Sequence, residues 1–269
     1  MTDLIVIPAR YGSTRLPGKP LVPIAGRTLL ERVVSVARRA AGIAGDCAVV
    51  VATDDPRIAD LAATLGCEAA MTSAAISSGS GRACAVAAMR ADHPEIVVNL
   101  QGDAPFIPPE MVATLITAAR GATAACITPV VALDWPALDA MRAHKRHSPF
   151  SGTTCIRGEG GRAFWFSKAI IPAIRDEARL RAEGPISPVF RHLGLYAYRF
   201  AALRQFEATP PGVYEQLEGL EQLRFLEMGL DILTVEVAPP VHAMSGIDTA
   251  QDVELAEALI GQFGDPFVP

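Results

Sequence analysis

Short apolar runs alternate with longer amphipathic stretches over the first 120 residues of the chain. The runs Leu4–Pro8, Ala48–Ala52 and Ile96–Leu100 predict buried strands, and Glu68–Met71 predicts a weaker one. The segments between them have helical spacing and are Thr28–Ala41, Pro56–Leu65 and Arg82–Ala91. Asp54 and Asp55 before Pro56 are typical of a capped helix start. Alternation of this kind predicts a parallel sheet covered by helices on both faces.

The pattern changes at Thr123, where strands are expected to follow one another more directly. The predicted strands are Thr123–Val131, Leu193–Tyr198, Ile232–Val237 and a hairpin of Ser151–Arg157 with Ala163–Phe166 around the turn at 158–161. The predicted helices are Tyr214–Glu227 and Thr249–Phe263, with a helical or irregular stretch over Asp134–His147. Residues 173–190 are charged and rich in proline, so a mobile surface loop is expected there.

Composition narrows the class of protein. Half of the 269 residues are hydrophobic, yet no run of roughly 18 apolar residues suggests a membrane span, and no secretory signal is evident. The net charge of −5 argues against a nucleic-acid partner. The five cysteines are scattered and form no CxxC motif, which favours reduced core thiols in a cytoplasmic protein.

The segment Arg10-Tyr-Gly-Ser-Thr-Arg15-Leu-Pro-Gly-Lys19-Pro20 is the most informative loop in the chain. It follows the first predicted strand and combines three cations with two glycines and two aliphatic hydroxyl groups. Arginine and lysine bind phosphate oxygens, and glycine lets backbone N–H groups approach them closely. The glycine spacing matches neither a Walker loop nor a dinucleotide-binding fingerprint. The loop therefore predicts a polyphosphate site of another type and disfavours a nicotinamide-dependent oxidoreductase.

A carboxylate follows a second predicted strand in the segment Val97-Val-Asn-Leu-Gln-Gly-Asp103. If this strand is a parallel neighbour of the first, Asp103 lies on the same sheet edge as the basic loop, where it could hold Mg²⁺ together with phosphate oxygens. Asp248, after the last strand, is either a second ligand of that metal or a residue next to a helix cap. The residues alone leave this choice open.

Three further segments give weaker signals. Small residues at 78–81 precede a helix, where backbone groups could contact a base or ribose. His192, Gly194, Tyr196 and Tyr198 would share one face of a strand, which suits either a pocket for a hydroxylated ligand or a subunit interface. Glu218, Glu221 and Gln222 would share one face of a helix, a pattern usually found on wet surfaces.

Taken together, these segments resemble the CMP-3-deoxy-manno-octulosonate (Kdo) synthetase family of cytidylyltransferases nearly end to end. The matching motifs are Ile7-Pro-Ala-Arg-Tyr-Gly-Ser-Thr-Arg-Leu-Pro-Gly-Lys-Pro, Val51-Ala-Thr-Asp-Asp, Val98-Asn-Leu-Gln-Gly-Asp, Phe166-Ser, Arg191-His-Leu-Gly-Leu-Tyr-Ala-Tyr-Arg, Leu220-Glu-Gln-Leu-Arg and Gly246-Ile-Asp-Thr. The resemblance implies an α/β Rossmann-like nucleotidyltransferase fold, a mostly parallel sheet with a smaller inserted β-rich subregion. It further implies a homodimer that uses CTP and Mg²⁺.

The resemblance also implies domains and residue roles. Residues 1–122 would form the nucleotide-binding core, 123–215 an acceptor-binding and dimerisation subregion, and 216–269 the returning core elements. The residues expected to bind CTP are Arg10, Ser13, Arg15, Lys19, Ser78, Gly79, Ser80 and Arg82, with Arg10, Lys19 and Asp103 catalytic. Asp103 and Asp248 would bind the metal. The residues expected to contact the sugar acid are Gln101, Lys168, His192, Tyr196, Glu221 and Gln222.

Departures from the family pattern gather where the acceptor is expected. The chain has Gly79-Ser-Gly-Arg82 where Gly-Thr-Glu/Asp-Arg is usual, and Ala104 where a glutamate usually follows the aspartate. It also has Lys168 in place of arginine, and Phe150-Ser-Gly-Thr-Thr-Cys155 in place of an Asn-x-Val-Lys-Val strand. An arginine-to-lysine change is not conservative where a carboxylate is held bidentately. Kdo is the favoured acceptor. The alternatives are 8-amino-Kdo, another nonulosonic acid, a small phosphonate, or a nucleotide-binding homologue without catalysis.

Overall fold

The computed structural model describes residues 2–12, 15–242, 244 and 246–268 of the chain. It divides into two compact units. Unit 1 comprises residues 1–121, 195–207 and 239–269, and unit 2 comprises 122–194 and 208–238. None of the helices within these described ranges combines the length and apolar character that crossing a bilayer requires.

Unit 1 contains a parallel sheet with one antiparallel strand. Its strands pair in the order β5, β4, β1, β6 and β11, and only β11 runs against its neighbour. The strands are β1 (Asp3–Pro8), β4 (Cys47–Thr53), β5 (Glu68–Met71), β6 (Ile96–Asn99) and β11 (Tyr196–Arg199), and a separate small hairpin is formed by β2 (Pro23–Ile24) and β3 (Arg27–Thr28). The core residues Leu4–Ile7 of β1 are at most 1% exposed. The apolar runs thus form the buried centre of the sheet, as predicted.

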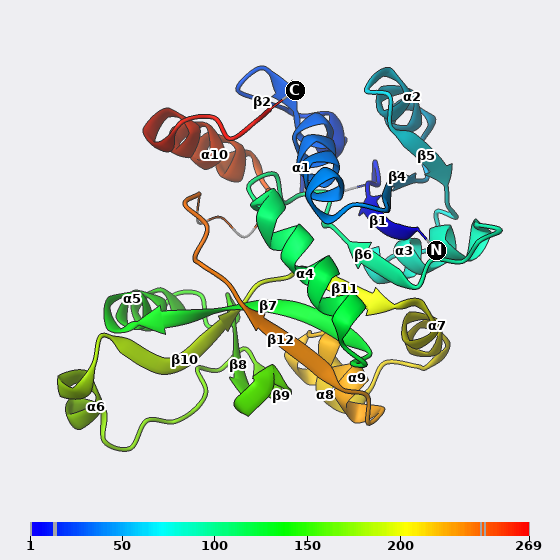
Figure 1. Ribbon diagram of the computed structural model, residues 1–269. Coiled ribbons are helices and arrows are strands. Elements are labelled where there is room, and N and C mark those ends of the chain that lie inside the picture. The colour runs from blue at the N-terminus through cyan, green and yellow to red at the C-terminus, as the bar shows by residue number, and fades with distance from the viewer. Residues whose placement is uncertain (1, 13–14, 243, 245, 269) are drawn as a thin grey trace. The chain divides into compact units, whose positions relative to one another are not determined.

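Helices pack against this sheet (Figure 1). They are α1 (Leu29–Ala44), α2 (Pro56–Thr64), α3 (Gly79–Met89) and α4 (Pro109–Gly121). Unit 1 also contains α7 (Phe200–Ala208), α10 (Ala250–Phe263) and a short 3-10 turn η1 (Lys19–Leu21). Thr28 caps α1 by accepting a hydrogen bond from the Glu31 backbone, and Asp55 caps α2 in the same way from Arg57. Thr249 and Asp252 cap α10 reciprocally. The helix after the basic loop begins at Leu29, since η1 and the β2–β3 hairpin come first.

Unit 2 is richer in antiparallel pairing. Strands β7, β10, β8 and β9 pair antiparallel in that order, and β12 joins β7 in parallel. The elements are β7 (Cys126–Asp134), α5 (Trp135–Lys145), β8 (Thr153–Arg157), η2 (Glu159–Gly161), β9 (Ala163–Ser167), α6 (Glu177–Glu183), β10 (Ile186–His192), α8 (Val213–Glu218), α9 (Gln222–Glu227) and β12 (Ile232–Glu236). The fold class predicted from the sequence is therefore confirmed.

Two predicted elements in unit 2 were wrong. The stretch 173–190, expected to be a loop, contains α6 and most of β10, because β10 obtains its backbone partners from β7 and β8 on either side. The single helix expected over Tyr214–Glu227 is two helices. Gly219 lies between them with a φ of +63°, in the left-handed region where a helix ends.

The unit boundaries also differ from the predicted domains. The expected first boundary at 122 lies next to the observed one, but residues 195–207 belong to unit 1, because β11 pairs with β6 there. Residues 216–238 belong to unit 2 through the pairing of β12 with β7. Pairing between strands that are distant in sequence decides both assignments.

Candidate functional site

The sheet of unit 1 brings the chemistry-bearing loops to one edge. β1 and β6 are parallel neighbours, so the basic loop after β1 and the segment ending in Asp103 after β6 leave the sheet side by side. A polar pocket of about 230 Å³ lies there. The sequence-predicted residues that line it are Arg10, Arg15, Lys19, Ser78, Gly79, Arg82, Gln101, Asp103 and Asp248.

The pocket's charges converge on Lys19. Its Nζ lies 2.7 Å from Asp103 Oδ2 and 3.0 Å from Asp248 Oδ1. Arg15 Nη2 lies 3.0 Å from Asp248 Oδ2. A backbone hydrogen bond from Ile247 N to Asp103 O, 2.9 Å long, ties the two carboxylate-bearing segments together. Two carboxylates from segments distant in sequence thus share one cation.

This arrangement fits a divalent metal bound together with phosphate. The Lys19 ammonium shows that a cation can be accommodated between the Asp103 and Asp248 carboxylates. Within the described part of the chain, no group of three or more His, Cys, Asp or Glu side chains could hold a metal without other ligands. Mg²⁺ commonly takes one or two carboxylates and completes its shell with substrate phosphates and water.

Gly102 is required by the close approach of two backbones at the pocket. A Cβ atom built on it would lie 2.2 Å from the Pro8 carbonyl oxygen at the end of β1. No side chain fits at that distance, so the residue before Asp103 packs directly on the strand that leads into the basic loop. The position of Asp103 beside Lys19 depends on this contact.

Substituting Gly102 tests that contact. Gly102→Ala is expected to destabilise the protein by about 2 kcal/mol, because the added methyl group overpacks a site with no room. Urea unfolding measures the change. The matched control is Gly42→Ala, within α1, where a Cβ would meet nothing within 4 Å and stability should rise by up to about 1 kcal/mol. Equal stability of both variants would contradict the close approach at Gly102.

The residues at the start of α3 have different roles. Ser78 is the N-cap of α3, and its hydroxyl accepts a hydrogen bond from Gly81 N. Gly79 is the first residue of the helix and lines the pocket, so the positive end of the helix faces it. Ser80 is buried, and its Oγ donates to Ser78 Oγ rather than lining the pocket. Ser13 lies outside the described residues.

Arg82 is held by protein groups. Its side chain is 2% exposed, with Nη2 2.8 Å from Asp54 Oδ2 and Nη1 donating to Thr72 Oγ1. The pair links α3 to the loop after β4, which gives Asp54 a role that sequence reasoning missed. Arg10, by contrast, is exposed and has no hydrogen-bond or ion-pair partner among the described residues. Its guanidinium is free to meet an anion in the pocket.

The residues predicted to bind the acceptor are found in both units. Gln101 lines the pocket of unit 1, and Tyr196 is on β11, where its ring stacks on Tyr198 with centroids 5.7 Å apart. Lys168, His192, Glu221 and Gln222 belong to unit 2. The expectation that His192, Tyr196 and Tyr198 share one strand was wrong, since His192 ends β10 and Tyr196 begins β11.

His192 is a buried, neutral residue. Burial, and to a smaller extent the charge of Lys168, lowers the pKa of His192 to about 3. Its Nε2 lies 2.8 Å from Thr128 Oγ1, and its ring meets Phe166 edge to face. At neutral pH the His192 imidazole is therefore uncharged, and it can donate one hydrogen bond and accept another.

Lys168 is positioned by its backbone. Glu218 accepts hydrogen bonds from Lys168 N and Ser167 Oγ, both 2.7 Å long. Burial lowers the pKa of the Lys168 ammonium. No side-chain partner of this ammonium is present among the described residues. Glu218 was placed on a wet helix face from the sequence, and only the fold shows that it anchors the end of β9.

Lys145, from α5, holds the same region. Its Nζ donates to the carbonyl oxygens of Ser151 (2.5 Å), Lys168 (2.6 Å) and Gly152 (3.1 Å), and lies 3.3 Å from that of Pro149. The ammonium thus ties the segment before β8 to the residue after β9. Burial and the nearby Lys168 charge lower the pKa of Lys145.

Removing this ammonium is expected to weaken binding of the acceptor more than binding of the nucleotide. Lys145→Met removes the donor shared by these carbonyl groups, two of which are part-buried, and loosens the segment next to Lys168, so KM for the acceptor should rise about tenfold. KM for CTP should not change, and steady-state kinetics with each substrate varied separately gives both values. The control is Arg146→Met at the exposed neighbouring residue. Equal increases in both KM values would contradict a local role for Lys145.

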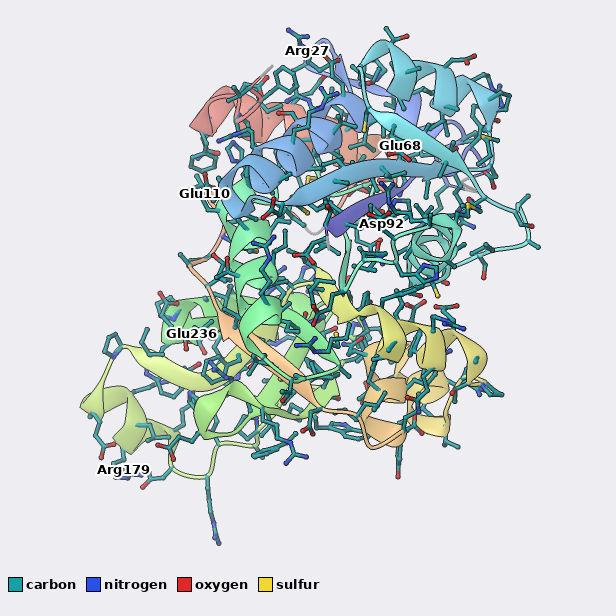
Figure 2. The ribbon with its side chains drawn as sticks, turned by 45° about the vertical axis from the view of Figure 1, so that its right-hand side comes forward. Arg27, Glu68, Asp92, Glu110, Arg179 and Glu236 are labelled. Carbon is teal, nitrogen blue, oxygen red and sulfur yellow. The ribbon has the colours of Figure 1, made fainter. Side chains whose placement is uncertain are left out.

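A larger cavity of about 500 Å³ lies elsewhere in unit 1, under the C-terminal tail. Its lining is dominated by apolar residues and prolines, and Arg32 within it is already paired with Asp265. Arg27 and Arg32 both face the Phe267 ring of that tail, and Figure 2 labels Arg27. The convergent charges are in the smaller pocket, which is therefore the candidate active site.

The fold and the charged pocket define a nucleotide-transferring enzyme, and comparison with known proteins specifies its class. A model of the cytidylyltransferase family matches residues 4–232. The 3-deoxy-manno-octulosonate cytidylyltransferase of Maricaulis maris is 40% identical over 98% of this chain and 99% of its own. One from Anaeromyxobacter sp. (strain K) is 41% identical over 95% and 96%. The chain belongs to the family of 3-deoxy-manno-octulosonate cytidylyltransferases.

A solved structure agrees with this assignment. A CMP:2-keto-3-deoxy-manno-octonic acid synthetase complexed with CTP superposes with a TM-score of 0.82 at 35% identity, covering 97% of this chain and 99% of that one. A cytidylyltransferase from Leptospira borgpetersenii gives a TM-score of 0.62 at 18% identity over 98% and 88%, which shows a shared fold alone.

Proposed function

We propose that this enzyme transfers CMP from CTP to 3-deoxy-D-manno-octulosonate and releases pyrophosphate. The observation that carries the proposal is the convergence of Lys19 with Asp103 and Asp248 in a polar pocket beside Arg10 and Arg15. Such a group of charges suits a triphosphate with a divalent cation. The family membership and the likeness to a synthetase complexed with CTP support the choice of nucleotide and acceptor.

The pocket residues would have different roles in phosphoryl transfer. Arg10, Arg15 and Lys19 would bind the triphosphate and offset the charge that develops on it as pyrophosphate leaves. Asp103 and Asp248 would hold Mg²⁺, which when bound polarises phosphate oxygens and helps to orient the reacting groups. When the nucleotide enters, the Lys19 ammonium would exchange its carboxylate contacts for phosphate contacts.

The reaction is an attack of an acceptor hydroxyl oxygen on the α-phosphorus of CTP. A new O–P bond forms, the bond to pyrophosphate breaks, and the hydroxyl proton is released. Attacking and leaving oxygens must lie in line, so positioning and charge compensation are the main tasks of the protein. Gln101, Lys168, His192, Tyr196, Glu221 and Gln222 would orient the acceptor. Ser78, Gly79, Ser80 and Arg82 would lie near the nucleoside, and Ser13 would contribute to phosphate binding.

Calorimetric titration with CTP, with and without Mg²⁺, tests the nucleotide half of the proposal. We expect CTP binding that is tighter with Mg²⁺, together with Mg²⁺-dependent release of pyrophosphate when Kdo is added. CTP binding without pyrophosphate release under any condition would favour a nucleotide-binding homologue. Absence of CTP binding would overturn the proposal.

One observation favours a second candidate, a cytidylyltransferase for a different acid. Lys168 stands where arginine is usual in the family, and a lysine cannot hold a carboxylate bidentately. Replacing Lys168 with arginine is expected to lower KM for Kdo about threefold if Kdo is a poor acceptor for the native chain. Kinetics with Kdo and with 8-amino-Kdo measures the change. Unaltered kinetics would place residue 168 outside the acceptor site.

The proposal includes a homodimer in the cytoplasm. In unit 2, the strand β9 ends the order of antiparallel strands, and Phe164, Tyr214 and Leu217 near it are each more than half exposed. Exposed apolar side chains of this kind suit contact with a second copy. Light scattering after size exclusion tests this state. The five cysteines are unpaired thiols, which suits a reducing compartment.

A further inference from the structure

Tyr11 is the aromatic residue of the basic loop, and its ring does not line the pocket that Arg10 lines. The ring lies against Gly18 at the other end of the loop. A Cβ atom on Gly18 would come within 3.1 Å of Tyr11 Cε2, and Gly18 N donates a 3.1 Å hydrogen bond to Tyr11 O. Ring and backbone together close the loop at its base.

A face of the Tyr11 ring is covered by Arg57. The guanidinium carbon of Arg57 lies 3.5 Å from the ring centroid, a close cation–π contact. Asp55 fixes this guanidinium by accepting hydrogen bonds from Nε (2.9 Å) and Nη2 (2.7 Å). Asp55 is itself fixed as the N-cap of α2. The contacts therefore run without a break from the helix cap through the guanidinium to the aromatic ring.

The register of the sheet explains why these residues meet. β1 and β4 are parallel partners up to Pro8 and Ala52, and Ala9 N continues the pairing with a 2.8 Å hydrogen bond to Ala52 O. The loops that follow the two strands leave the same sheet edge together. Tyr11 lies in the loop after β1 and Arg57 in the first turn of α2, just after the loop that follows β4, so the paired ends of β1 and β4 bring the two residues together.

We propose that Arg57 is a positioning residue for nucleotide binding, which clamps Tyr11 against Gly18 and so holds the basic loop in its binding conformation. Arg10 precedes Tyr11 and Lys19 follows Gly18, so the clamp sets both ends of the loop that carries the cations. The inference rests on the proposed role of this loop in binding the triphosphate. Neither Tyr11 nor Arg57 lines the pocket, so the clamp acts through the loop.

The clamp should affect binding of CTP rather than the chemical step. Without it, the loop must be ordered when the nucleotide binds, and that entropy cost weakens binding of ground state and transition state alike. Arg57→Leu is therefore expected to raise the Kd and KM of CTP about fivefold, or about 1 kcal/mol at 1.36 kcal/mol per tenfold change. The kcat and the KM of the acceptor should stay near their native values.

A double-mutant cycle on CTP binding tests the proposal. Calorimetry gives the Kd of CTP for the native protein, Arg57→Leu, Tyr11→Leu and the double variant. If Arg57 acts through the Tyr11 ring, the double variant should bind CTP no more weakly than Tyr11→Leu alone. Arg57→Lys keeps a cation over the ring and should recover part of the affinity. The control is Arg90→Leu, which removes the C-cap arginine of α3. Its partner is Glu68, which is labelled in Figure 2.

The outcomes separate this inference from the proposed function. If the native protein does not bind CTP, the function proposal fails. If it does bind CTP, unchanged affinity of Arg57→Leu overturns the clamp. Additive losses in the double variant also overturn it, because they would mean that Arg57 acts on the nucleotide independently of Tyr11. A fall in kcat with an unchanged Kd would likewise contradict a positioning role.

Discussion

Replacing Asp103 with alanine is expected to lower kcat by about a thousandfold or more while the protein stays folded. The carboxylate is one of two that share the Lys19 ammonium in the pocket, and we assign it to Mg²⁺. Losing it removes a metal ligand at the point where charge develops, a change that typically costs two to three orders of magnitude or more. Pyrophosphate release at saturating CTP, Mg²⁺ and Kdo measures the effect.

The control for this variant is Asp92→Ala, which removes a carboxylate from the exposed turn after α3 (Figure 2). Its turnover should equal that of the native chain. Thermal unfolding of both variants separates loss of function from loss of structure. An Asp103→Ala protein with near-native turnover would remove the metal assignment and, with it, the proposed division of work in the pocket.

Replacing Lys19 with methionine is expected to weaken CTP binding about a hundredfold. The ammonium is mostly buried and carries the only charge that contacts both Asp103 and Asp248 among the described residues. Removing one partner of such a charge group costs about 2–5 kcal/mol, partly because the remaining charges are left uncompensated. Calorimetric titration with CTP measures the loss.

The same variant makes a prediction about the free protein. With the ammonium absent, the two carboxylates repel each other, so Mg²⁺ alone should raise the Tm of Lys19→Met more than that of the native chain. Arg179→Met on α6 of unit 2 serves as the control and should respond as the native chain does (Figure 2). If Mg²⁺ raises the Tm of Lys19→Met and of the native protein equally, the Lys19 ammonium and Mg²⁺ do not share one position between the two carboxylates.

The sequence predicted the parallel core well because its signals are local. The run Leu4–Pro8 is apolar and bounded by polar residues, and Asp55 with Pro56 marks the start of α2. The basic loop follows one predicted strand and Asp103 follows another. This was enough to predict that the loop and the carboxylate lie at one sheet edge. The hydrogen bond between Lys19 and Asp103 shows that they do.

The errors come from interactions that no local pattern records. β10 contains Ser187, Pro188 and Arg191, a poor strand by composition, and it is stabilised by neighbours on both sides. Gly219 interrupts an otherwise continuous amphipathic pattern. The pairing of Arg82 with Asp54 and the contact of Tyr11 with Arg57 each join a residue of a helix to a residue of a loop, so only the folded sheet brings them together.

Pyrophosphate release in the presence of CTP, Mg²⁺ and a panel of acids tests the central claim most directly. The panel contains Kdo, 8-amino-Kdo, N-acetylneuraminate and phosphonoformate, with a reaction lacking acceptor as the blank. We expect pyrophosphate release with Kdo, together with a CMP-linked product, and no release in the blank. Release only with another acid would contradict the proposed acceptor, and no release with any acid by a protein that binds CTP would contradict catalysis itself.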